Sequence, residues 1–585
     1  MIYNYIDEIL QGYTINLDVL RRDTNLYSIS MLQHTGSFHS SEFFFGNENS
    51  ELESVKFNDF LFKAKENNSS LVITPEYSCP WSTVRNLVDN IENLPSQNKL
   101  WVLGCESIIP TNVLEFRDAY NGLNNVEVVF NDIVDNAPGG VLLNPCLYIF
   151  KANDPNGIEK TIVLIQFKRQ HMGAWGNPLE QQKLIPGQHS YILRNSPDSI
   201  NLVTVICSDA MLFDGRHIYP GAEGQWDIQP YIILSIQMNP QPAHIEFRDF
   251  RRNILKVANK DVISLNWSSE GRSSGNPNFF GEYCKSNISL ITEHISNTSS
   301  IEEKLIDDNH KKGVYYTLIK PNRHCFYLTP KIEFFYLRMR KPILGLAPGP
   351  ANRRRGPEIK TIYEYDTVLE TFIEVEDTSD GYVDFTEDIQ IQSESLQDGA
   401  LNILDRERLI ALTSGELSKV KSGSNWYAVN TLKSFISEDT ETINRFTVTF
   451  DTNGKEYRIS QFGKIEALNV NILSDTNLYP DIIASFKDKC NEVMFLNRNG
   501  TKYNYNLVSN DDQIATVAFL GHTSKADAKA MLNQLTKLFP EEDLGNKRIV
   551  VWYKPSIAAD SYDYEATDVP KFTSTEQTNL TSITK

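Results

Sequence analysis

Three segments of the sequence each place one reactive side chain directly after a run of apolar residues. They are LVITPEYSCPW around Glu76, IQFKRQHMGAW around Lys168 and VTVICSDAMLF around Cys207. A short apolar run that ends in a polar residue is typical of a buried strand whose last residue emerges at the edge of a sheet. Proteins of the α/β class place their chemistry at this edge. The sequence therefore predicts a glutamate, a lysine and a cysteine at neighbouring strand ends.

These three side chains fit the chemistry of a thiol nucleophile. A free thiol with a pKa of about 8.5 is only slightly ionised at neutral pH, so it needs a base or a positive neighbour. Glu76 could accept the thiol proton and return it to a leaving amine, and Lys168 could hold negative charge on a tetrahedral oxygen. The backbone N–H of Ser208, directly after Cys207, is the natural second donor to that oxygen.

The order of these motifs resembles the carbon–nitrogen hydrolase (nitrilase/amidase) superfamily, over roughly residues 25–335. The segment YSISMLQHTG (27–36) is similar to the family's opening strand, and a helical stretch at 54–67 precedes the glutamate motif. LWVLGCES (100–107) and GGVLLNPCLYIF (139–150) look like the next two strands. The segment EQQKLIPG resembles the one that carries a second, positioning glutamate, here Glu180. FRRNILKVANKDVISLNWSSEG (250–271) resembles the end of the family's second half.

The resemblance implies an α/β fold, a nitrilase-like αββα sandwich. It also implies that an amide, carbamoyl or nitrile is hydrolysed through a thioester on Cys207. A small-molecule substrate and a homodimer or larger homo-oligomer are implied as well. No cofactor is expected, and the ten histidines form no metal-ligand pattern such as HExxH, so no metal is expected either.

One departure from the family pattern concerns the lysine. The family usually has a histidine two residues after it, but here His171 lies three residues after Lys168. An alignment without a gap would put Arg169 at the catalytic position, although an arginine does not readily donate a proton. We favour Lys168, and the choice between the two residues stays open at this point.

Each candidate also has a plain structural interpretation. Glu76 could cap the following helix, Cys207 could be a core residue, and Glu180 could be a solvated loop acid. Asp209 and Trp175 are candidates for the substrate pocket. Asp209 is expected to brace the turn after the nucleophile rather than react, and Trp175 could equally anchor its loop.

Composition favours a soluble enzyme, and the absence of targeting and membrane-spanning patterns leads us to expect a cytoplasmic one. The net charge of −19 argues against a general nucleic-acid surface, because phosphate contacts need clustered Lys and Arg. The start of the chain does not resemble a signal peptide, and no apolar stretch is long enough to span a bilayer. Seven scattered cysteines without a CxxC pair predict neither a disulfide framework nor a zinc cluster.

The character of the sequence changes after residue 337, where the nitrilase-like domain (1–337) is expected to end. Residues 338–360 are rich in Pro, Gly and Arg and are interpreted as a linker. An α+β domain of no recognised family is expected over 361–570. It would hold a strand pair from 361, a helix over 395–420, Asn-Gly hairpins near 453 and 499, and a β-α-β unit at its end. Residues 571–585 are expected to be a disordered tail.

A second class of function stays open. The additional C-terminal residues are not needed by a metabolic amidase, so the chain could be a nitrilase-like sensor or scaffold, for example in a bacterial defence system, whose C-terminal domain binds a protein partner. The retained Glu, Lys and Cys favour the enzyme.

Overall fold

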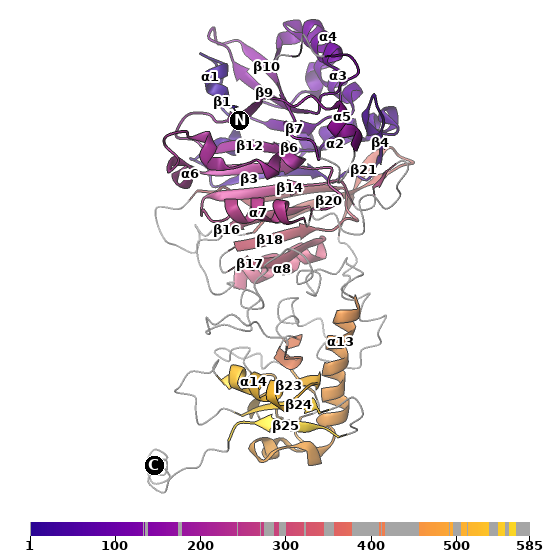
Figure 1. Cartoon of the computed structure of the whole chain (residues 1–585), viewed down its shortest axis with the longest axis vertical. Helices are drawn as coiled ribbons and strands as arrows, with labels where there is room; N and C mark the ends of the chain where they lie inside the picture. Colours follow the sequence, from indigo (N-terminus) through magenta and orange to yellow (C-terminus); the bar gives the residue numbers. More distant parts are fainter. Residues whose placement is uncertain are drawn as a thin grey trace.

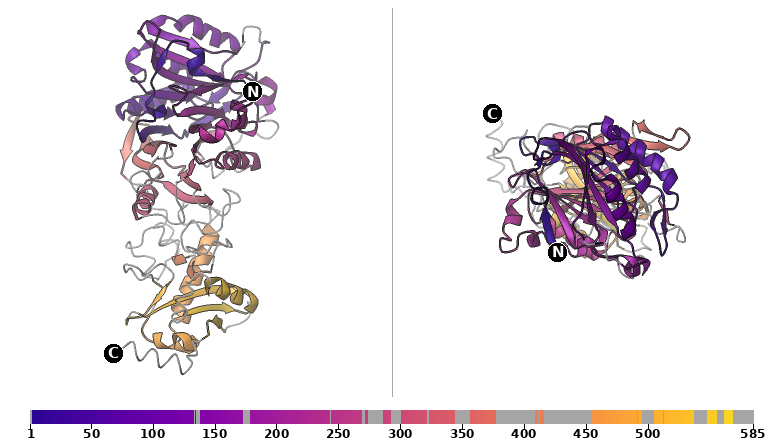
Figure 2. Two further views of the ribbon diagram at one scale, coloured as in Figure 1. Left: turned by 90° about the vertical axis from the view of Figure 1, so that its left-hand side faces the viewer. Right: turned by 90° about the horizontal axis from the view of Figure 1, so that it is seen from above.

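The structure is a computed structural model of the whole chain. It describes residues 2–132, 134, 138–172, 178–242, 244–268, 271–273, 286–291, 300–320, 323–343, 356–376, 409–410, 412–415, 455–490, 492–494, 505–511, 513–536, 548–555 and 561–568. Figures 1 and 2 show two large sheets at one end of the long axis of the molecule and a small sheet at the other.

The first large sheet has ten strands and carries two of the three predicted motifs. Nine of them follow the order β21-β20-β19-β3-β6-β7-β9-β10-β8, and β2 pairs with β9. Strands β3, β6 and β7 are parallel, whereas β9 is antiparallel to both β7 and β10. The carboxyl ends of β6 and β10 therefore lie at the same edge as the amino end of β9. The bounds are β2 (Thr14–Ile15), β3 (Leu26–Leu32), β6 (Leu71–Ile73), β7 (Leu100–Gly104), β8 (Val126–Val129), β9 (Pro145–Asn153), β10 (Glu159–Phe167), β19 (Phe334–Arg340), β20 (Glu358–Asp366) and β21 (Thr371–Val375).

The second large sheet has eight strands in the order β1-β11-β12-β13-β14-β16-β18-β17. Its central strands β12, β13 and β14 are parallel. The bounds are β1 (Ile2–Tyr5), β11 (His189–Leu193), β12 (Asn201–Ile206), β13 (Tyr231–Ile236), β14 (Lys260–Leu265), β16 (Asn287–Ile291), β17 (Val314–Lys320) and β18 (Arg323–Leu328). A separate small sheet is formed by β4 (Ser37–Ser40), β5 (Phe45–Asn47) and β15 (Arg272–Ser273).

Alternate residues of the central strands face different layers. In β7, Leu100 and Val102 enter a core shared with residues of the second sheet, such as Ile232 and Leu234, whereas Trp101 faces the outer side. Because both faces are covered, these strands are almost continuously apolar in sequence. This confirms the predicted α/β class.

Helices cover the outer faces of both sheets. On the first sheet, α2 begins after Asn49, whose side chain accepts a hydrogen bond from the backbone N–H of Leu52 at 3.1 Å and so caps the helix. The helix predicted over 54–67 is confirmed by α2. The helices of the two large sheets are α1 (Ile6–Ile9), α2 (Ser50–Glu66), α3 (Trp81–Asp89), α4 (Pro110–Tyr120), α5 (Pro178–Lys183), α6 (Gln225–Ile228), α7 (Ile245–Ile254) and α8 (Ser300–Lys311), with the 3₁₀ turns η1 (Asp18–Leu20), η2 (Ile91–Asn93), η3 (Leu123–Asn125), η5 (Cys207–Met211) and η6 (Gly215–Ile218).

The strand pair predicted from residue 361 exists, but it belongs to the first large sheet and not to the C-terminal domain. Strand β20 pairs with β19, with Phe334 opposite Tyr363, and β21 completes the sheet. The side chain of Asp59 on α2 accepts the backbone N–H of Phe372 at 2.6 Å and fixes β21 against the helix. The boundary at 361 is therefore wrong. The predicted linker also overlaps the end of β19, and its residues 344–355 lie outside the described residues.

The small sheet near the C-terminus confirms one local prediction and corrects another. Its order is β22 (Leu507–Val508), β23 (Ile514–His522), β24 (Ile549–Lys554) and β25 (Asp563–Ala566), and β23 and β24 are parallel strands joined across α14 (Lys525–Thr536). This is the predicted β-α-β unit. The hairpin around 453 is wrong, because residues 455–466 form α13 (Lys455–Glu466), which continues as a π-helix over Ala467–Ile472.

Three other C-terminal predictions are not tested. The second Asn-Gly hairpin, at 499–500, and the tail 571–585 lie outside the described residues, and so does most of the helix over 395–420. The remaining described elements of this part are the 3₁₀ turns η11 (Thr476–Leu478) and η12 (Asp481–Phe486). Among the described helices of the whole chain, none has the length and apolar character needed to cross a membrane.

Candidate active site

The predicted residues come together at one edge of the two large sheets. Glu76 follows β6, Lys168 follows β10 directly, and Cys207 follows β12 directly. The backbone N–H of Lys168 donates to the carbonyl oxygen of Asn144, the residue before β9, at 2.8 Å. The strand order thus puts side chains that are far apart in the sequence next to one another, as the three motifs predict.

The Glu76 carboxylate is fully buried and accepts three hydrogen bonds. Oε1 accepts hydrogen bonds from Nδ2 of Asn144 and from Nζ of Lys168, both at 2.7 Å. Oε2 accepts one from the backbone N–H of Met238 at 2.8 Å. Burial raises the pKa of Glu76 above its ordinary value, although Lys168 acts in the opposite direction. A carboxylate with a raised pKa is suited to accept and return a proton near neutral pH.

The backbone at Glu76 is also fixed. Nε1 of Trp267 donates to its carbonyl oxygen at 2.7 Å. Gly104 of β7 lies so close that a Cβ atom there would be 2.2 Å from the carbonyl oxygen of Pro75. A side chain at residue 104 would therefore displace the turn that carries the glutamate.

Lys168 bridges Glu76 and a second carboxylate. Its Nζ lies 2.6 Å from Oε1 of Glu180 on α5, and the three side chains are at most 4% exposed. Burial alone would lower the pKa of Lys168, but the two carboxylates raise it well above its ordinary value. Glu180 is held in turn by Tyr77, whose hydroxyl donates to Oε1 at 2.8 Å. Lys168 is therefore a fixed positive charge at the centre of the site.

Cys207 occupies a sharp turn between β12 and η5. Its backbone φ is +45°, in the left-handed region that side chains rarely adopt, and the residue is fully buried. Burial and the carboxylate of Glu76 raise the pKa of the Cys207 thiol well above its usual range, while Lys168 lowers it. A raised pKa disfavours the thiolate, so the use of Cys207 as a nucleophile needs a base such as Glu76.

Ser208 and Asp209 connect the turn after Cys207 to the loop after Lys168. The hydroxyl of Ser208 donates to the carbonyl oxygen of Gln170. Oδ1 of Asp209 accepts the backbone N–H groups of Arg169 and Gln170 at 3.0 and 2.8 Å. Burial raises the pKa of Asp209 to about 7. Asp209 is thus placed as a brace of the two loops.

The two remaining candidates lie apart from this cluster or outside the described residues. Nε and Nη1 of Arg169 are buried without a hydrogen-bond partner, and among the described residues its side chain makes no ion pair with Glu76 or Glu180. Trp175 lies in 173–177, outside the described residues. Cys79 is buried beside the site, and its backbone N–H donates to the carbonyl oxygen of Gly104 at 2.9 Å.

Sequence reasoning missed several residues of the site. They are Asn144, Tyr77, Met172, Met238 and Trp267, of which Met238 contributes only its backbone N–H. Asn144 had a signal, since it is a polar residue directly before a buried strand. The others lie near motifs but reach the site only through tertiary packing. Within the described ranges, no three His, Cys, Asp or Glu side chains form a group that could hold a metal ion.

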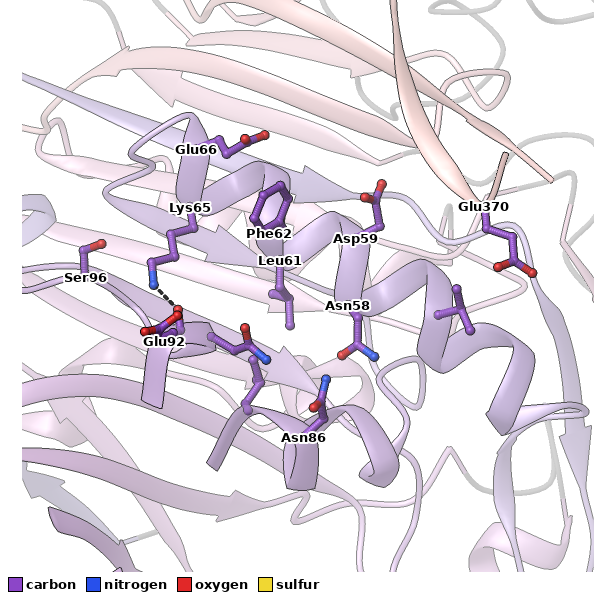
Figure 3. A pocket seen from close by; sticks show the side chains of 13 residues that line it. Asn58, Asp59, Leu61, Phe62, Lys65, Glu66, Asn86, Glu92, Ser96 and Glu370 are labelled. Atoms are coloured by element: carbon purple, nitrogen blue, oxygen red, sulfur yellow. Dashed lines mark hydrogen bonds between the residues drawn. The ribbon is translucent and has the colours of Figure 1, made fainter. Parts of the chain in front are cut away.

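A groove on the outer helices lies apart from these residues. It has a cavity volume of about 660 Å³ and lies between α2 and the segment around η2 (Figure 3). Phe62 of α2 projects into it and is 55% exposed. Nζ of Lys65 donates to the backbone carbonyl of Glu92, and the carboxylate of Glu370 lies at the other end. None of its lining residues belongs to the cluster around Lys168.

Solved structures that resemble this chain include an amidase and a CN-hydrolase superfamily protein, both at low sequence identity. No family model and no curated protein matches the chain. An amidase from Nesterenkonia sp. is 13% identical, with a TM-score of 0.27 over 53% of this chain and 93% of that chain. A mutant of the amidase from Nesterenkonia sp. AN1 in complex with butyramide is 13% identical, with a TM-score of 0.24 over 43% of this chain and 79% of that chain.

A CN-hydrolase superfamily protein from Xanthomonas campestris, with an arsenic adduct in its active site, is 12% identical, with a TM-score of 0.25 over 43% of this chain and 79% of that chain. The Nesterenkonia AN1 amidase is a nitrilase-superfamily protein. At these TM-scores the similarities do not decide the fold or the activity of this chain.

Proposed function

We propose that the N-terminal part of the chain hydrolyses a non-peptide carbon–nitrogen bond, in an amide, carbamoyl or nitrile substrate, through a thioester on Cys207. One observation carries the proposal. The ammonium of Lys168 is bonded to Glu76 at 2.7 Å and to Glu180 at 2.6 Å, and these charges lie close enough to Cys207 to shift the pKa of its thiol. An amide is the preferred substrate class.

For an amide, the first half of the reaction forms the thioester. Glu76 takes the thiol proton of Cys207 while the sulfur bonds to the carbonyl carbon, and the carbonyl oxygen becomes an oxyanion. The ammonium of Lys168 and the backbone N–H of Ser208 are the groups proposed to stabilise this oxyanion. The carbon–nitrogen bond then breaks, and the amine leaves with the proton from Glu76.

The second half of the reaction releases the acid. A water molecule gives its proton to Glu76 and attacks the thioester carbon. The carbon–sulfur bond breaks, the product leaves as a carboxylic acid, and the thiol of Cys207 regains its proton. Glu180 and Asn144 are positioning residues in this scheme, since they bond to Lys168 and Glu76 and not to the reacting atoms.

The test is intact mass spectrometry of the full chain with a panel of short aliphatic amides, together with an assay for released ammonia. We expect a mass increase that equals the acyl group minus the thiol hydrogen it replaces. We also expect Cys207→Ala and Cys207→Ser to abolish both this increase and the release of ammonia. Cys79→Ala is the matched control, because Cys79 is equally buried, whereas the described hydrogen bonds of Nζ of Lys168 go to Glu76 and Glu180. Ammonia release that persists in Cys207→Ala would overturn the mechanism.

The fold and assembly that go with this function are also proposals. Two sheets with a common core and helices on their outer faces support a nitrilase-like αββα sandwich, now extended to residue 375 by β20 and β21. A homodimer or larger homo-oligomer stays a proposal that light scattering of the purified chain can test.

A second candidate function is that of a sensor or scaffold with a protein partner. The groove in Figure 3 favours it, because exposed apolar side chains such as Phe62 and Val55 beside carboxylates are typical of a surface that binds another protein. Acylation of Cys207 distinguishes the enzyme from the scaffold. If no amide in the panel acylates Cys207, and Phe62→Glu abolishes the association with a partner that copurifies with the native chain, the scaffold replaces the enzyme.

A further inference from the structure

Met172 lies directly against the candidate nucleophile. Its Sδ is 3.5 Å from Sγ of Cys207. Cys207 is 0% exposed, whereas Met172 is partly exposed. A side chain that contacts a buried thiol and also reaches solvent separates at least part of that thiol from bulk water.

The loop that carries Met172 is held by backbone hydrogen bonds at four of the five residues from 168 to 172. The backbone of Lys168 bonds to Asn144 and Gly187, each at 2.8 Å. Asp209 accepts the N–H groups of the next two residues, and Ser208 donates to the carbonyl oxygen of Gln170. The backbone N–H of Met172 donates to Oε2 of Glu180 at 2.9 Å, the same carboxylate that holds Lys168. The backbone of Met172 is therefore fixed by the framework of the site, and its flexible side chain starts from a fixed position beside Cys207.

We propose that Met172 determines how large an acyl group the site accepts, an inference that rests on the proposed function. An acyl carbon bonded to Sγ of Cys207 lies closer to the sulfur than Sδ of Met172 does now, so the substituent on that carbon must fit beside the thioether or displace it. Methionine is unbranched and has three rotatable bonds, so it can yield to a small group more readily than to a long one. The preferred substrates are amides of short carboxylic acids.

The first experiment measures access to the thiol without turnover. Iodoacetamide and the bulkier N-phenyl-iodoacetamide alkylate a thiol in the same way: sulfur bonds to the CH₂ carbon, iodide leaves, and the thiol proton goes to buffer. Peptide mapping follows modification of Cys207 in the full native chain, in Met172→Ala and in Met172→Leu. Met211→Ala is the control, because it is the same truncation at the far end of η5, where Sδ of Met211 accepts a hydrogen bond from Nε2 of Gln170 at 3.9 Å.

The expected result is a change of selectivity. In Met172→Ala the rate for N-phenyl-iodoacetamide, divided by the rate for iodoacetamide, rises by about tenfold or more, the effect of removing a few buried carbon and sulfur atoms from a pocket wall. Met172→Leu and Met211→Ala keep the native ratio. An unchanged ratio in Met172→Ala, or an equal rise in Met211→Ala, overturns the proposal. If Met172→Ala does not fold, Met172→Val is measured instead and should give a smaller rise in the same ratio of rates. No rise in Met172→Val would overturn the proposal.

A second experiment separates this proposal from the proposed function. Where amides are turned over, the kcat/KM for hexanamide relative to that for acetamide should rise by about tenfold in Met172→Ala. If Met172→Ala changes the ratio of alkylation rates but no amide is turned over, the proposed function is wrong and Met172 still controls access to Cys207. If amides are turned over but Met172→Ala keeps the native preference between hexanamide and acetamide, the role of Met172 is wrong and the proposed function stands.

Discussion

Nζ of Lys168 lies 2.6 Å from Oε1 of Glu180, and the two side chains are only 1% and 4% exposed. A buried ion pair of this kind contributes little net stability, because desolvation of the two charges offsets their attraction, but the loss of one partner leaves a buried charge alone. The pair is therefore better explained by positioning than by stability. It orients the ammonium that also contacts Glu76.

Two replacements of Glu180 should show whether it acts by orienting Lys168 or by its negative charge. Glu180→Gln keeps a hydrogen-bond acceptor for Lys168 and Tyr77, whereas Glu180→Ala removes it and opens space beside the ammonium. We expect kcat to fall more in Glu180→Ala than in Glu180→Gln, with smaller changes in KM, in steady-state assays of ammonia release. Equal activity in both variants and the native chain would show that Glu180 does not position Lys168.

Lys168 and Arg169 should differ strongly in their effects. Of these two residues, Lys168 is the one that bonds to both glutamates in the described part of the chain, so Lys168→Ala should lower kcat by roughly 10²–10³-fold, the effect of losing one oxyanion donor. Arg169→Ala should lower kcat much less. The same assay compares both variants, and circular dichroism checks that each is folded. The reverse ranking would assign the catalytic position to Arg169.

Asp209 should make the stability of the protein depend on pH. Burial raises the pKa of its carboxyl from 3.8 to about 7, so between these values the folded chain keeps a proton that the unfolded chain releases. The free energy of unfolding should therefore fall as pH rises from about 4 to about 7, by at most about 1.4 kcal/mol per pH unit. Thermal unfolding across this range should show a smaller decrease for Asp209→Asn. Asp198→Asn, which removes an exposed carboxylate, is the control and should follow the native curve.

The end of the N-terminal domain can be located by truncation. A chain that stops after residue 376 keeps β20, β21 and the bond from Asp59 to Phe372. A chain that stops near residue 345 uncovers β19 and the buried ring of Phe334, which stacks on Tyr363 at 4.5 Å. We expect the longer chain to unfold cooperatively in calorimetry and the shorter one to aggregate or melt at lower temperature. Equal melting temperatures would restore the boundary near residue 337.

The sequence predicted the candidate residues that the structure brings together, because each lies where an apolar strand ends. Glu76, Lys168 and Cys207 stand out as polar residues after buried runs, and parallel strands bring such positions to one edge. The partners of these residues could not be found in this way. Tyr77 and Met172 reach the cluster through side-chain directions and loop paths that depend on packing between distant segments. Asn144 is intermediate, because it precedes an antiparallel strand whose start lies at the same edge.

The two errors in the C-terminal half have different physical origins. The alternation over β20 and β21 correctly indicated strands, but a local pattern does not specify which sheet a strand joins, and the partner is β19, across the supposed linker. For α13, the Asn-Gly pair and the alternating residues of 455–462 suggested a hairpin. The buried residues Phe462, Ile465 and Leu468 instead recur every three positions, as they do on one face of a helix.

The attachment of β21 has a mechanical consequence. Strand β21 is the outermost strand of the first large sheet, and its last residue, Val375, lies opposite Ile362. A force applied from the C-terminal side would separate the antiparallel pair β20–β21 one residue pair at a time, instead of breaking all its hydrogen bonds together. Detachment would begin at Val375 and reach Thr371, beside Asp59 on α2, last. Tension on the C-terminal part would thus act on the outer helix layer long before it reached the turn that holds Cys207.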